Sequence, residues 1–333
     1  MRIAVTGGAG FIGSHTTTLL LEAGHEVLIL DSFANAEDDV PDRVAGIAGR
    51  EAHVARCDIT DAVPLGRELG AFRPEAVIHF AGLKAVGEAV ANPLEYYRVN
   101  VGGSVTLFRE MAEIACNRLV FSSSATVYGD PDEVPIPETH GLNPTNPYGH
   151  SKRMVEQVIE DWGVSTPALA AISLRYFNPV GAHPSARIGE APQGVPNNLM
   201  PYVAQVAQGR REQLSVFGND YGTPDGTGVR DYIHVMDLAR AHLAALDLTG
   251  RETGVQAINV GTGTGYSVLE MIAAFAAASG REVPYEITDR RPGDIATSLA
   301  NPEKAKAQMG WQAELDLDDM CRDAWAWQRG RNA

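Results

Sequence analysis

The chain begins with a pattern that determines much of its architecture: residues 2–13 read Arg-Ile-Ala-Val-Thr-Gly-Gly-Ala-Gly-Phe-Ile-Gly. The β-branched run Ile3–Thr6 predicts a buried strand, and the glycines that follow predict a tight turn. Apolar residues at helical spacing then predict a helix over Ile12–Ala23. A strand, a glycine-rich turn and a helix in this order are typical of a dinucleotide-binding unit. There the turn lets the backbone approach a pyrophosphate, whose charge lies on the helix N-terminus.

An acidic residue ends the next predicted strand, Glu26–Asp31. Asp31 follows Gly13 by 18 residues. A carboxylate at this position can hold the adenosine ribose hydroxyls and would repel a 2′-phosphate. The pattern therefore favours NAD over NADP.

The first 175 residues alternate short apolar runs with longer helical stretches, which predicts a parallel sheet covered by helices on both faces. Strands are predicted at Ile3–Thr6, Glu26–Asp31, Ala76–Ala81, Arg118–Ser122, Leu169–Arg175 and Ala257–Val260, with one more ending near Asp58. Helices are predicted at Ile12–Ala23, Val63–Gly70, Pro93–Ile114, Tyr148–Trp162, Leu199–Gln208, Val235–Leu248, Val268–Ser279 and Asp316–Trp327. The fold class is α/β: a Rossmann-type doubly wound parallel sheet with a smaller α/β C-terminal substrate lobe.

Frequent Pro, Gly and Asn residues after position 177 indicate where this smaller lobe begins. We expect residues 1–176, with about 233–262, to form the dinucleotide-binding domain. Residues 177–232 and 263–333 would form the lobe, so the chain crosses between the two more than once.

Composition excludes several classes of protein. The 333 residues are 44% hydrophobic and 21% charged, which is ordinary for a globular protein, and the net charge of −15 disfavours nucleic acid or an anionic membrane as the main partner. The three cysteines, Cys57, Cys116 and Cys321, lie far apart, which argues against a disulfide framework or a structural zinc site. No apolar run approaches the roughly 18 residues that a membrane span needs. With no secretory signal pattern at the N-terminus, a cytoplasmic location is expected.

Polar side chains gather where the predicted strands end. Tyr148 and Lys152 lie four residues apart in a helical stretch and so share a face. A lysine ammonium near a phenol lowers the tyrosine pKa and makes a usable general base. A run of three serines, Ser122 to Ser124, ends the fifth strand at the same edge, where a hydroxyl can bind a substrate oxygen. Asp58-Ile59 and the segment Phe80–Lys84 follow two other strands and would lie along the cofactor.

Together these motifs resemble the extended short-chain dehydrogenase/reductase superfamily, and within it the UDP-glucose 4-epimerase family. The resemblance covers nearly the whole chain. Its motifs are Gly7–His15, Phe80–Glu88, Phe121–Gly129, Tyr148–Lys152, Arg175–Pro184, Pro196–Pro201, Phe217–Tyr221 and Gly226–Asp237.

The resemblance implies an isomerase that interconverts UDP-glucose and UDP-galactose with a tightly held NAD. Tyr148 would take the proton of the sugar 4-hydroxyl, Ser124 would bind the 4-oxygen, and Lys152 would tune Tyr148 and hold the nicotinamide ribose. The hydride would pass from C4 to the nicotinamide and return after the 4-keto sugar has rotated. The implied cofactor contacts are Gly7, Gly10, Phe11, Ile12, Gly13, Asp31, Asn35, Asp58, Ile59, Phe80, Ala81, Gly82, Lys84, Asn100, Ser122, Tyr148, Lys152, Tyr176 and Phe177.

The implied sugar-nucleotide contacts come mainly from the second half of the chain. Arg230 and Arg291 would pair with the two phosphates, because guanidinium groups match their geometry. Asp294 would hold the uridine ribose. The full set is Lys84, Ser124, Ala125, Thr126, Tyr148, Asn178, Asn197, Asn198, Leu199, Ser215, Val216, Phe217, Arg230, Arg291, Asp294 and Ser298.

Ser298 bears on substrate choice. In the resembled family a tyrosine at this position restricts the pocket, and a small residue admits an N-acetyl group. UDP-GlcNAc and UDP-GalNAc are therefore expected as further substrates. The resemblance also implies a homodimer formed through helices 93–114 and 148–162.

Other enzymes of the superfamily stay open as alternatives: another nucleotide-sugar epimerase, a decarboxylase or a dehydratase. A dehydratase needs a carboxylic acid beside the serine, and the run Ser124–Tyr128 has none. A cofactor-binding regulator without turnover would be expected to lack the serine, the tyrosine or the lysine, and all three are present.

Overall fold

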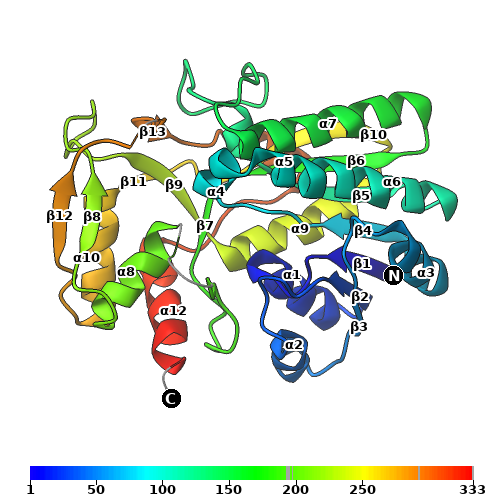
Figure 1. Ribbon diagram of the computed structural model, residues 1–333, viewed down its shortest axis with the longest axis horizontal. Helices are drawn as coiled ribbons and strands as arrows, with labels where there is room; N and C mark the ends of the chain where they lie inside the picture. The colour runs from blue at the N-terminus through cyan, green and yellow to red at the C-terminus, as the bar shows by residue number, and fades with distance from the viewer. Residues whose placement is uncertain (193–195, 197, 292, 332–333) are drawn as a thin grey trace.

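The computed structural model describes residues 1–192, 196, 198–291 and 293–331. Within these residues, seven strands form one sheet in the order β10-β6-β5-β4-β1-β2-β3, and Figure 1 shows them one below another. Their bounds are β1 Arg2–Thr6, β2 Glu26–Asp31, β3 His53–Arg56, β4 Ala76–His79, β5 Arg118–Ser124, β6 Ala170–Tyr176 and β10 Gly254–Val260. Every neighbouring pair is parallel. The predicted fold class is confirmed.

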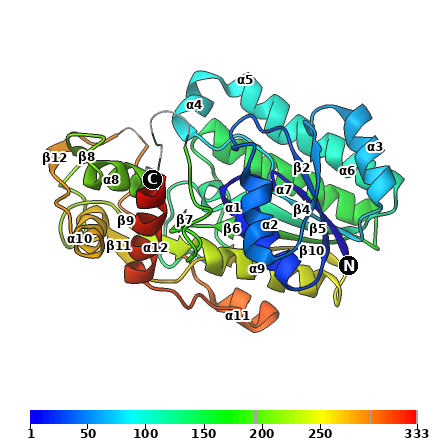
Figure 2. The same ribbon diagram turned by 90° about the horizontal axis from the view of Figure 1, so that it is seen from below.

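Both faces of this sheet are buried under helices. Because side chains alternate along a strand, Ile3 and Val5 pack in one core while Ala4 packs in the other. The first core lies under α1 Phe11–Glu22, α2 Val40–Ala48 and α9 Val235–Thr249, and the second under α3 Ala62–Phe72, α6 Gly103–Glu113 and α7 Pro147–Ser165. Figure 2 shows α1, α2 and α9 together on one side of the sheet. Two-sided burial explains why these strands are continuous apolar runs.

The long helix predicted over Pro93–Ile114 is interrupted. The structure has α5 Pro93–Tyr96, a π-helical turn Tyr97–Gly102 and then α6, preceded by a short α4 at Val86–Ala91. A π-turn widens the helix locally and is frequent at functional sites. Here it contains Asn100, one of the predicted cofactor contacts.

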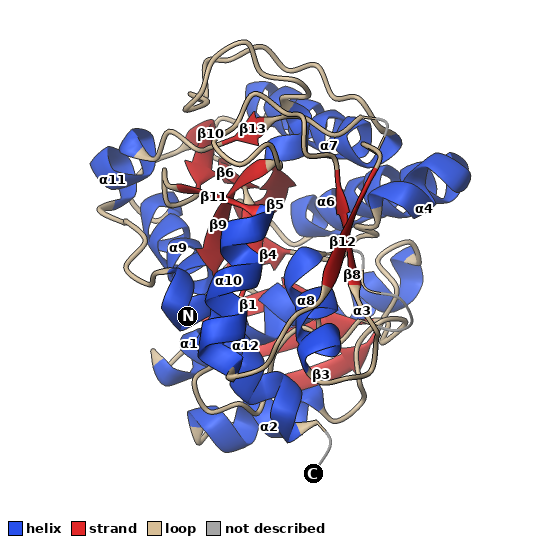
Figure 3. Ribbon diagram, turned by 90° about the vertical axis from the view of Figure 1, so that its left-hand side faces the viewer, coloured by secondary structure: helices blue, strands red, loops and turns tan. Residues whose placement is uncertain are grey.

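A smaller group of elements lies beside the carboxyl edge of the main sheet. β7 Asn178–Val180, β9 Val229–His234, β11 Gly265–Ser267 and β13 Thr297–Ser298 form one sheet, and β8 Leu214–Phe217 pairs with β12 Tyr285–Thr288. Three helices, α8 Leu199–Ala207, α10 Val268–Ser279 and α12 Leu317–Gly330, pack around a core that includes Met200, Met271 and Met320. Figure 3 views the molecule from this side. These strands carry little signal in the sequence, because most are very short and their partners are distant in the chain, and none of them is among the predicted strands.

We retain the two-lobe division of the chain as a proposal, with one feature that complicates it. Helix α11 Glu303–Met309 comes late in the chain, within the residues assigned to the smaller lobe. Its Ala305 and Met309 pack instead in the core of the main sheet, and Figure 2 shows α11 beside α9.

A buried polar network joins α7 to the main sheet. Glu156 of α7 accepts hydrogen bonds from Arg175 of β6 at 3.0 and 2.8 Å, and the Ser123 hydroxyl donates to the same carboxylate. Arg175 also donates to the Tyr128 hydroxyl (3.0 Å), which donates to Asn259 of β10 (2.6 Å). All five side chains are buried. The network therefore fixes α7 against β5, β6 and β10 through groups that have no access to solvent.

The Glu156→Gln substitution tests this network. It leaves the Arg175 guanidinium buried without its counter-charge, so the free energy of unfolding should fall by about 3 kcal/mol. Equilibrium unfolding in urea measures the change. The control is Glu160→Gln on the same helix, whose exposed ion pair with Arg153 is expected to contribute less than about 1 kcal/mol. Equal effects of the two substitutions would contradict the account.

Candidate active site

The glycine turn brings three backbone segments into close contact. Gly7 has a φ of +68°, and a Cβ placed on it would lie 2.8 Å from the Ala81 nitrogen. A Cβ on Gly13 would lie 2.1 Å from the Gly7 carbonyl oxygen. Helix α1 begins at Phe11 without a side-chain cap, so its first amides stay available for an anion. Gly10, Phe11 and Ile12 thus form a cradle that fits a pyrophosphate.

Asp31 joins this turn to the end of β2. One carboxylate oxygen accepts a hydrogen bond from the Ala9 amide (3.0 Å), and the other accepts one from the Phe33 amide (2.8 Å). Burial raises the pKa of Asp31, and the two amides and Arg56 oppose that rise. Asn35 lies a few residues further on, in an exposed bend. Asp31, the predicted ribose-binding acid, therefore also holds the glycine turn against the end of β2.

The ends of β3 and β4 carry the next predicted contacts. Asp58 is exposed and accepts hydrogen bonds from the Thr60 amide and hydroxyl, both at 2.8 Å, while Ile59 is buried. Asn100 exchanges hydrogen bonds with the backbone of Leu83: its oxygen accepts from the amide (2.8 Å) and its nitrogen donates to the carbonyl (3.0 Å). Asn100 therefore holds the segment that contains Phe80, Ala81, Gly82 and Lys84.

Ser124, Tyr148 and Lys152 meet at the carboxyl end of β5. Ser124 is the last residue of β5, and Tyr148 and Lys152 lie one turn apart at the start of α7. The Ser124 hydroxyl lies close enough to that of Tyr148 to affect the pKa of the phenol. The Lys152 ammonium donates to the Ser122 carbonyl (2.6 Å) and lies 5.8 Å from the centre of the Tyr148 ring. The three residues predicted to act together are thus neighbours.

The electrostatics of this group correct one expectation. Burial raises the pKa of Tyr148 to about 12, against the lowering effect of the Ser124 hydrogen bond. Burial also lowers the pKa of Lys152 to about 8, which the carboxylate of Glu156 opposes. Lys152 was expected to lower the pKa of Tyr148. Desolvation of the Tyr148 hydroxyl dominates instead, and the Lys152 ammonium is directed to the Ser122 carbonyl.

Glu156, which the sequence motifs did not indicate, belongs to the same arrangement. It follows Lys152 by four residues, just as Lys152 follows Tyr148, so all three lie on one face of α7. That spacing was a readable signal. The spacing alone does not show that Glu156 is paired, because only the fold brings Arg175 of β6 beside it.

The chain passes directly from the main sheet into the smaller one beside the catalytic group. Tyr176 ends β6, and its hydroxyl is hydrogen-bonded to His242. Phe177 is buried against Val127 and Tyr128. Asn178 then begins β7 and donates to the Asp231 carbonyl (3.0 Å). Ala125 and Thr126 form a short 3₁₀ turn after Ser124.

The other predicted substrate contacts form two groups. In the first, Ser298 of β13 pairs in register with Arg230 of β9, whose guanidinium donates to the Val229 carbonyl (2.9 Å). In the second, Arg291 lies 4.2 Å from the centre of the Phe217 ring and donates to Asp294 (3.2 Å).

The remaining predicted contacts lie on β8 and α8. Ser215 and Val216 precede Phe217 on β8, with Val216 buried. Asn198 is the residue before α8, and Leu199 is its first residue. Asn197 lies outside the described residues.

A glycine cradle at β1, an acid at the end of β2 and a serine–tyrosine–lysine group at β5 and α7 define an extended short-chain dehydrogenase/reductase. Residues 4–324 match the protein family described as GDP-mannose 4,6 dehydratase. The chain is 55% identical to UDP-glucose 4-epimerase of Bacillus subtilis, over 98% of this chain and 97% of that one. It belongs to the UDP-glucose 4-epimerase family, as the sequence motifs predicted.

Solved structures agree with this assignment. The UDP-glucose 4-epimerase of Stenotrophomonas maltophila, solved with bound NAD and formylated UDP-arabinopyranose, has a TM-score of 0.98 and 48% identity, covering 100% of this chain and 99% of that one. The enzyme of Bifidobacterium longum, in complex with NAD⁺ and UDP, has a TM-score of 0.96 and 47% identity, covering 100% and 99%. The predicted NAD cofactor is consistent with both.

Gly7→Ala tests the cradle. The added Cβ would meet the backbone at Ala81 and would strain a positive φ, so the affinity for NAD should fall at least about tenfold. Isothermal titration with NAD measures it. Gly49→Ala is the matched control, because Gly49 has a φ of +67° with no atom within 4 Å of the new Cβ. Similar losses of affinity in both variants would show that backbone strain, and not the close approach, is responsible.

Proposed function

We propose that this enzyme interconverts UDP-glucose and UDP-galactose by inverting C4 of the sugar, with NAD bound to the main sheet. The observation that carries the proposal is the Ser124–Tyr148–Lys152 group, which lies at the same sheet edge as the glycine cradle. Family membership supports the substrates, and the cradle with Asp31 supports the cofactor. Bound NAD supplies a reversible hydride acceptor at C4.

The chain's own residues supply the proton chemistry. Tyr148 takes the proton of the 4-hydroxyl while the Ser124 hydroxyl binds the same oxygen. Because burial raises the pKa of Tyr148, nearby positive charge is needed for it to act as a base. Lys152 is poised to supply part of that charge. A 4-keto sugar then turns about its diphosphate linkage and presents its other face, and Tyr148 returns the proton.

The rest of the predicted contacts are proposed as binding residues. Around NAD they are Gly7, Gly10, Phe11, Ile12, Gly13, Asp31, Asn35, Asp58, Ile59, Phe80, Ala81, Gly82, Lys84, Asn100, Ser122, Tyr176 and Phe177. Around the sugar nucleotide they are Lys84, Ala125, Thr126, Asn178, Asn197, Asn198, Leu199, Ser215, Val216, Phe217, Arg230, Arg291, Asp294 and Ser298. The diphosphate would be held by Arg230 and Arg291 while the sugar turns.

Acceptance of UDP-GlcNAc and UDP-GalNAc is part of the proposal. It rests on Ser298, a small side chain on β13 in register with the proposed phosphate ligand Arg230. A serine there leaves more room than an aromatic side chain would.

A homodimer and a cytoplasmic location are proposed as well. Leu94 of α5, Val105 of α6 and Met154 of α7 are exposed apolar residues on the helices predicted to pair, and these helices lie side by side in Figure 1. Such a face favours contact with another chain. All three cysteines are free and buried, which suits a reducing compartment. No helix in the described part of the chain is long and apolar enough to cross a membrane.

Tyr148→Phe tests the chemistry. Removing the phenolic hydroxyl removes the proposed base, so kcat for UDP-galactose should fall at least about 100-fold. Chromatographic separation of products from NAD-loaded enzyme measures it. Tyr285→Phe, at an exposed tyrosine of β12, should keep full activity. A Tyr148→Phe enzyme that keeps more than about a tenth of the wild-type kcat would exclude this role.

Ser298→Tyr tests the substrate range. The wild type should convert both UDP-galactose and UDP-GalNAc in parallel assays. The tyrosine should reduce turnover of UDP-GalNAc at least about tenfold while UDP-galactose is little affected, because overfilling a pocket disfavours the larger group. Ser298→Ala keeps a small side chain and should keep both activities. A wild-type enzyme active on UDP-galactose alone would refute the proposal for N-acetyl sugars.

A further inference from the structure

Glu190 connects two proposed ligand-binding residues that come from different parts of the chain. One of its carboxylate oxygens accepts a hydrogen bond from the Lys84 ammonium at 2.7 Å and another from the Asn198 amide at 2.7 Å. Lys84 follows β4 of the main sheet, and Asn198 precedes α8 of the smaller lobe. The Glu190 side chain is only 10% exposed, whereas that of Lys84 is 59% exposed.

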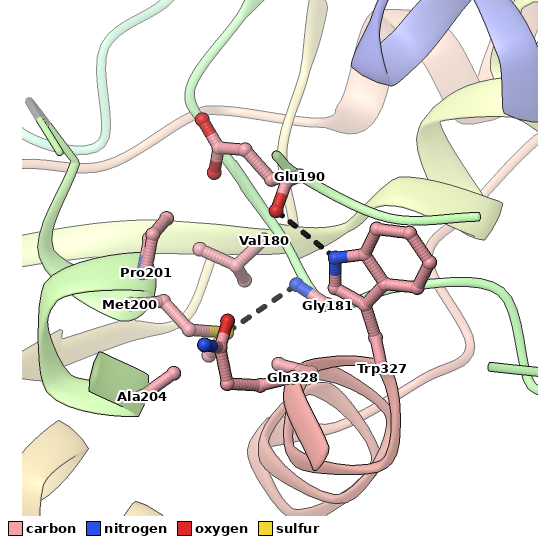
Figure 4. Close-up of a pocket in the computed structure, with 9 residues that line it drawn as sticks. Val180, Gly181, Glu190, Met200, Pro201, Ala204, Trp327 and Gln328 are labelled. Carbon is pink, nitrogen blue, oxygen red and sulfur yellow. Dashed lines mark hydrogen bonds between the residues drawn. The ribbon is translucent and has the colours of Figure 1, made fainter. Parts of the chain in front are cut away.

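The backbone at Glu190 packs against Trp327 of α12. Its carbonyl accepts a hydrogen bond from the Trp327 indole at 3.0 Å, which Figure 4 shows. A Cβ on the preceding Gly189 would lie 2.5 Å from the same indole ring, so the backbone at Gly189 packs directly against Trp327. The cavity between Glu190, Trp327 and Met200 measures about 20 Å³, which is room for about one water molecule. The backbone that carries the Glu190 carboxylate is thus closely packed.

The contacts at Glu190 leave donors free for a ligand. An ammonium group has three N–H donors and a side-chain amide has two, and each gives one to Glu190. Charge-assisted bonds to one carboxylate fix the positions of both groups. Without the Glu190 carboxylate, Lys84 would be a flexible exposed side chain. Ordering the lysine when a ligand binds would then cost conformational entropy.

We propose that Glu190 is a positioning residue for the sugar-nucleotide site, which orients Lys84 and Asn198 before the ligand arrives. The inference rests on the proposed function, because it takes both residues as ligand contacts. Within the described residues, Glu190 forms hydrogen bonds with Lys84, Asn198 and Trp327, and not with Ser124, Tyr148 or Lys152. Its loss should therefore weaken binding and leave the chemical step almost unchanged.

Glu190→Ala in the NAD-loaded enzyme should raise KM for UDP-galactose about tenfold and change kcat by less than about twofold. Glu190→Gln keeps an acceptor oxygen without the charge and should give an intermediate rise. Glu252→Ala, at an exposed glutamate after α9, is the matched control and should leave both constants unchanged. Equal losses in kcat and kcat/KM, or no rise in KM, would overturn the proposal.

A second measurement separates positioning from a general structural role. In an enzyme that already carries Lys84→Ala and Asn198→Ala, the further Glu190→Ala change should raise KM no more than about twofold, because its partners are gone. A full tenfold rise in that background would overturn the proposal. Melting temperatures identify any variant that fails to fold. If Glu190→Ala is such a variant, Glu190→Gln replaces it in both measurements of KM.

Calorimetric titration with UDP keeps this inference separate from the proposed function. If the wild type fails to convert UDP-galactose, the proposed function fails, and Glu190 is judged on affinity for UDP alone. The expected result is about tenfold weaker binding of UDP to Glu190→Ala, and unchanged binding would overturn the inference.

Discussion

The close approach of the glycine turn to the end of β4 is the constraint on which the rest of this structure depends. With a Cβ at Gly7 or Gly13, the turn could not lie against Ala81 or against its own carbonyl. Asp31 completes the constraint, because its carboxylate bonds to the amide of Ala9 within the turn. The site is thus built from backbone geometry before any catalytic side chain is placed.

A second constraint lies below the catalytic group. Burying Glu156 and Arg175 removes both from water, and this costs free energy that only a well-formed pair with further hydrogen bonds can offset. Ser123 and Tyr128 supply those bonds. The pair fixes α7 relative to β6, and the Ser123 hydrogen bond fixes it relative to β5, so Tyr148 and Lys152 are fixed relative to Ser124. A negative charge one turn from Lys152 also helps to keep that buried lysine protonated.

The two parts of the molecule are joined where the chemistry takes place. The chain leaves the main sheet at Tyr176 and enters the smaller one at Asn178, with Phe177 buried between them. Lys84 and Glu190 form a second link, between the loop after β4 and the segment that leads to α8. Under the proposed function, cofactor and sugar nucleotide together contact both parts, so the relative placement of the two parts matters as much as the identity of any contact residue.

The sequence by itself determined the main sheet, most of its helices, the glycine cradle and the serine, tyrosine and lysine of the candidate site. These follow from local patterns: apolar runs, glycines that a turn requires, and a four-residue spacing that places side chains on one helix face. It did not reveal the π-turn at Tyr97–Gly102 or the short strands β7 to β13 outside the main sheet, since a few residues carry little periodic signal and their partners are far along the chain. It also misjudged the pKa of Tyr148, which burial raises. Only the tertiary structure decided the Glu156–Arg175 pair and the Glu190 contacts, because solvent exclusion and the direction of a charged group depend on what distant segments bring beside it.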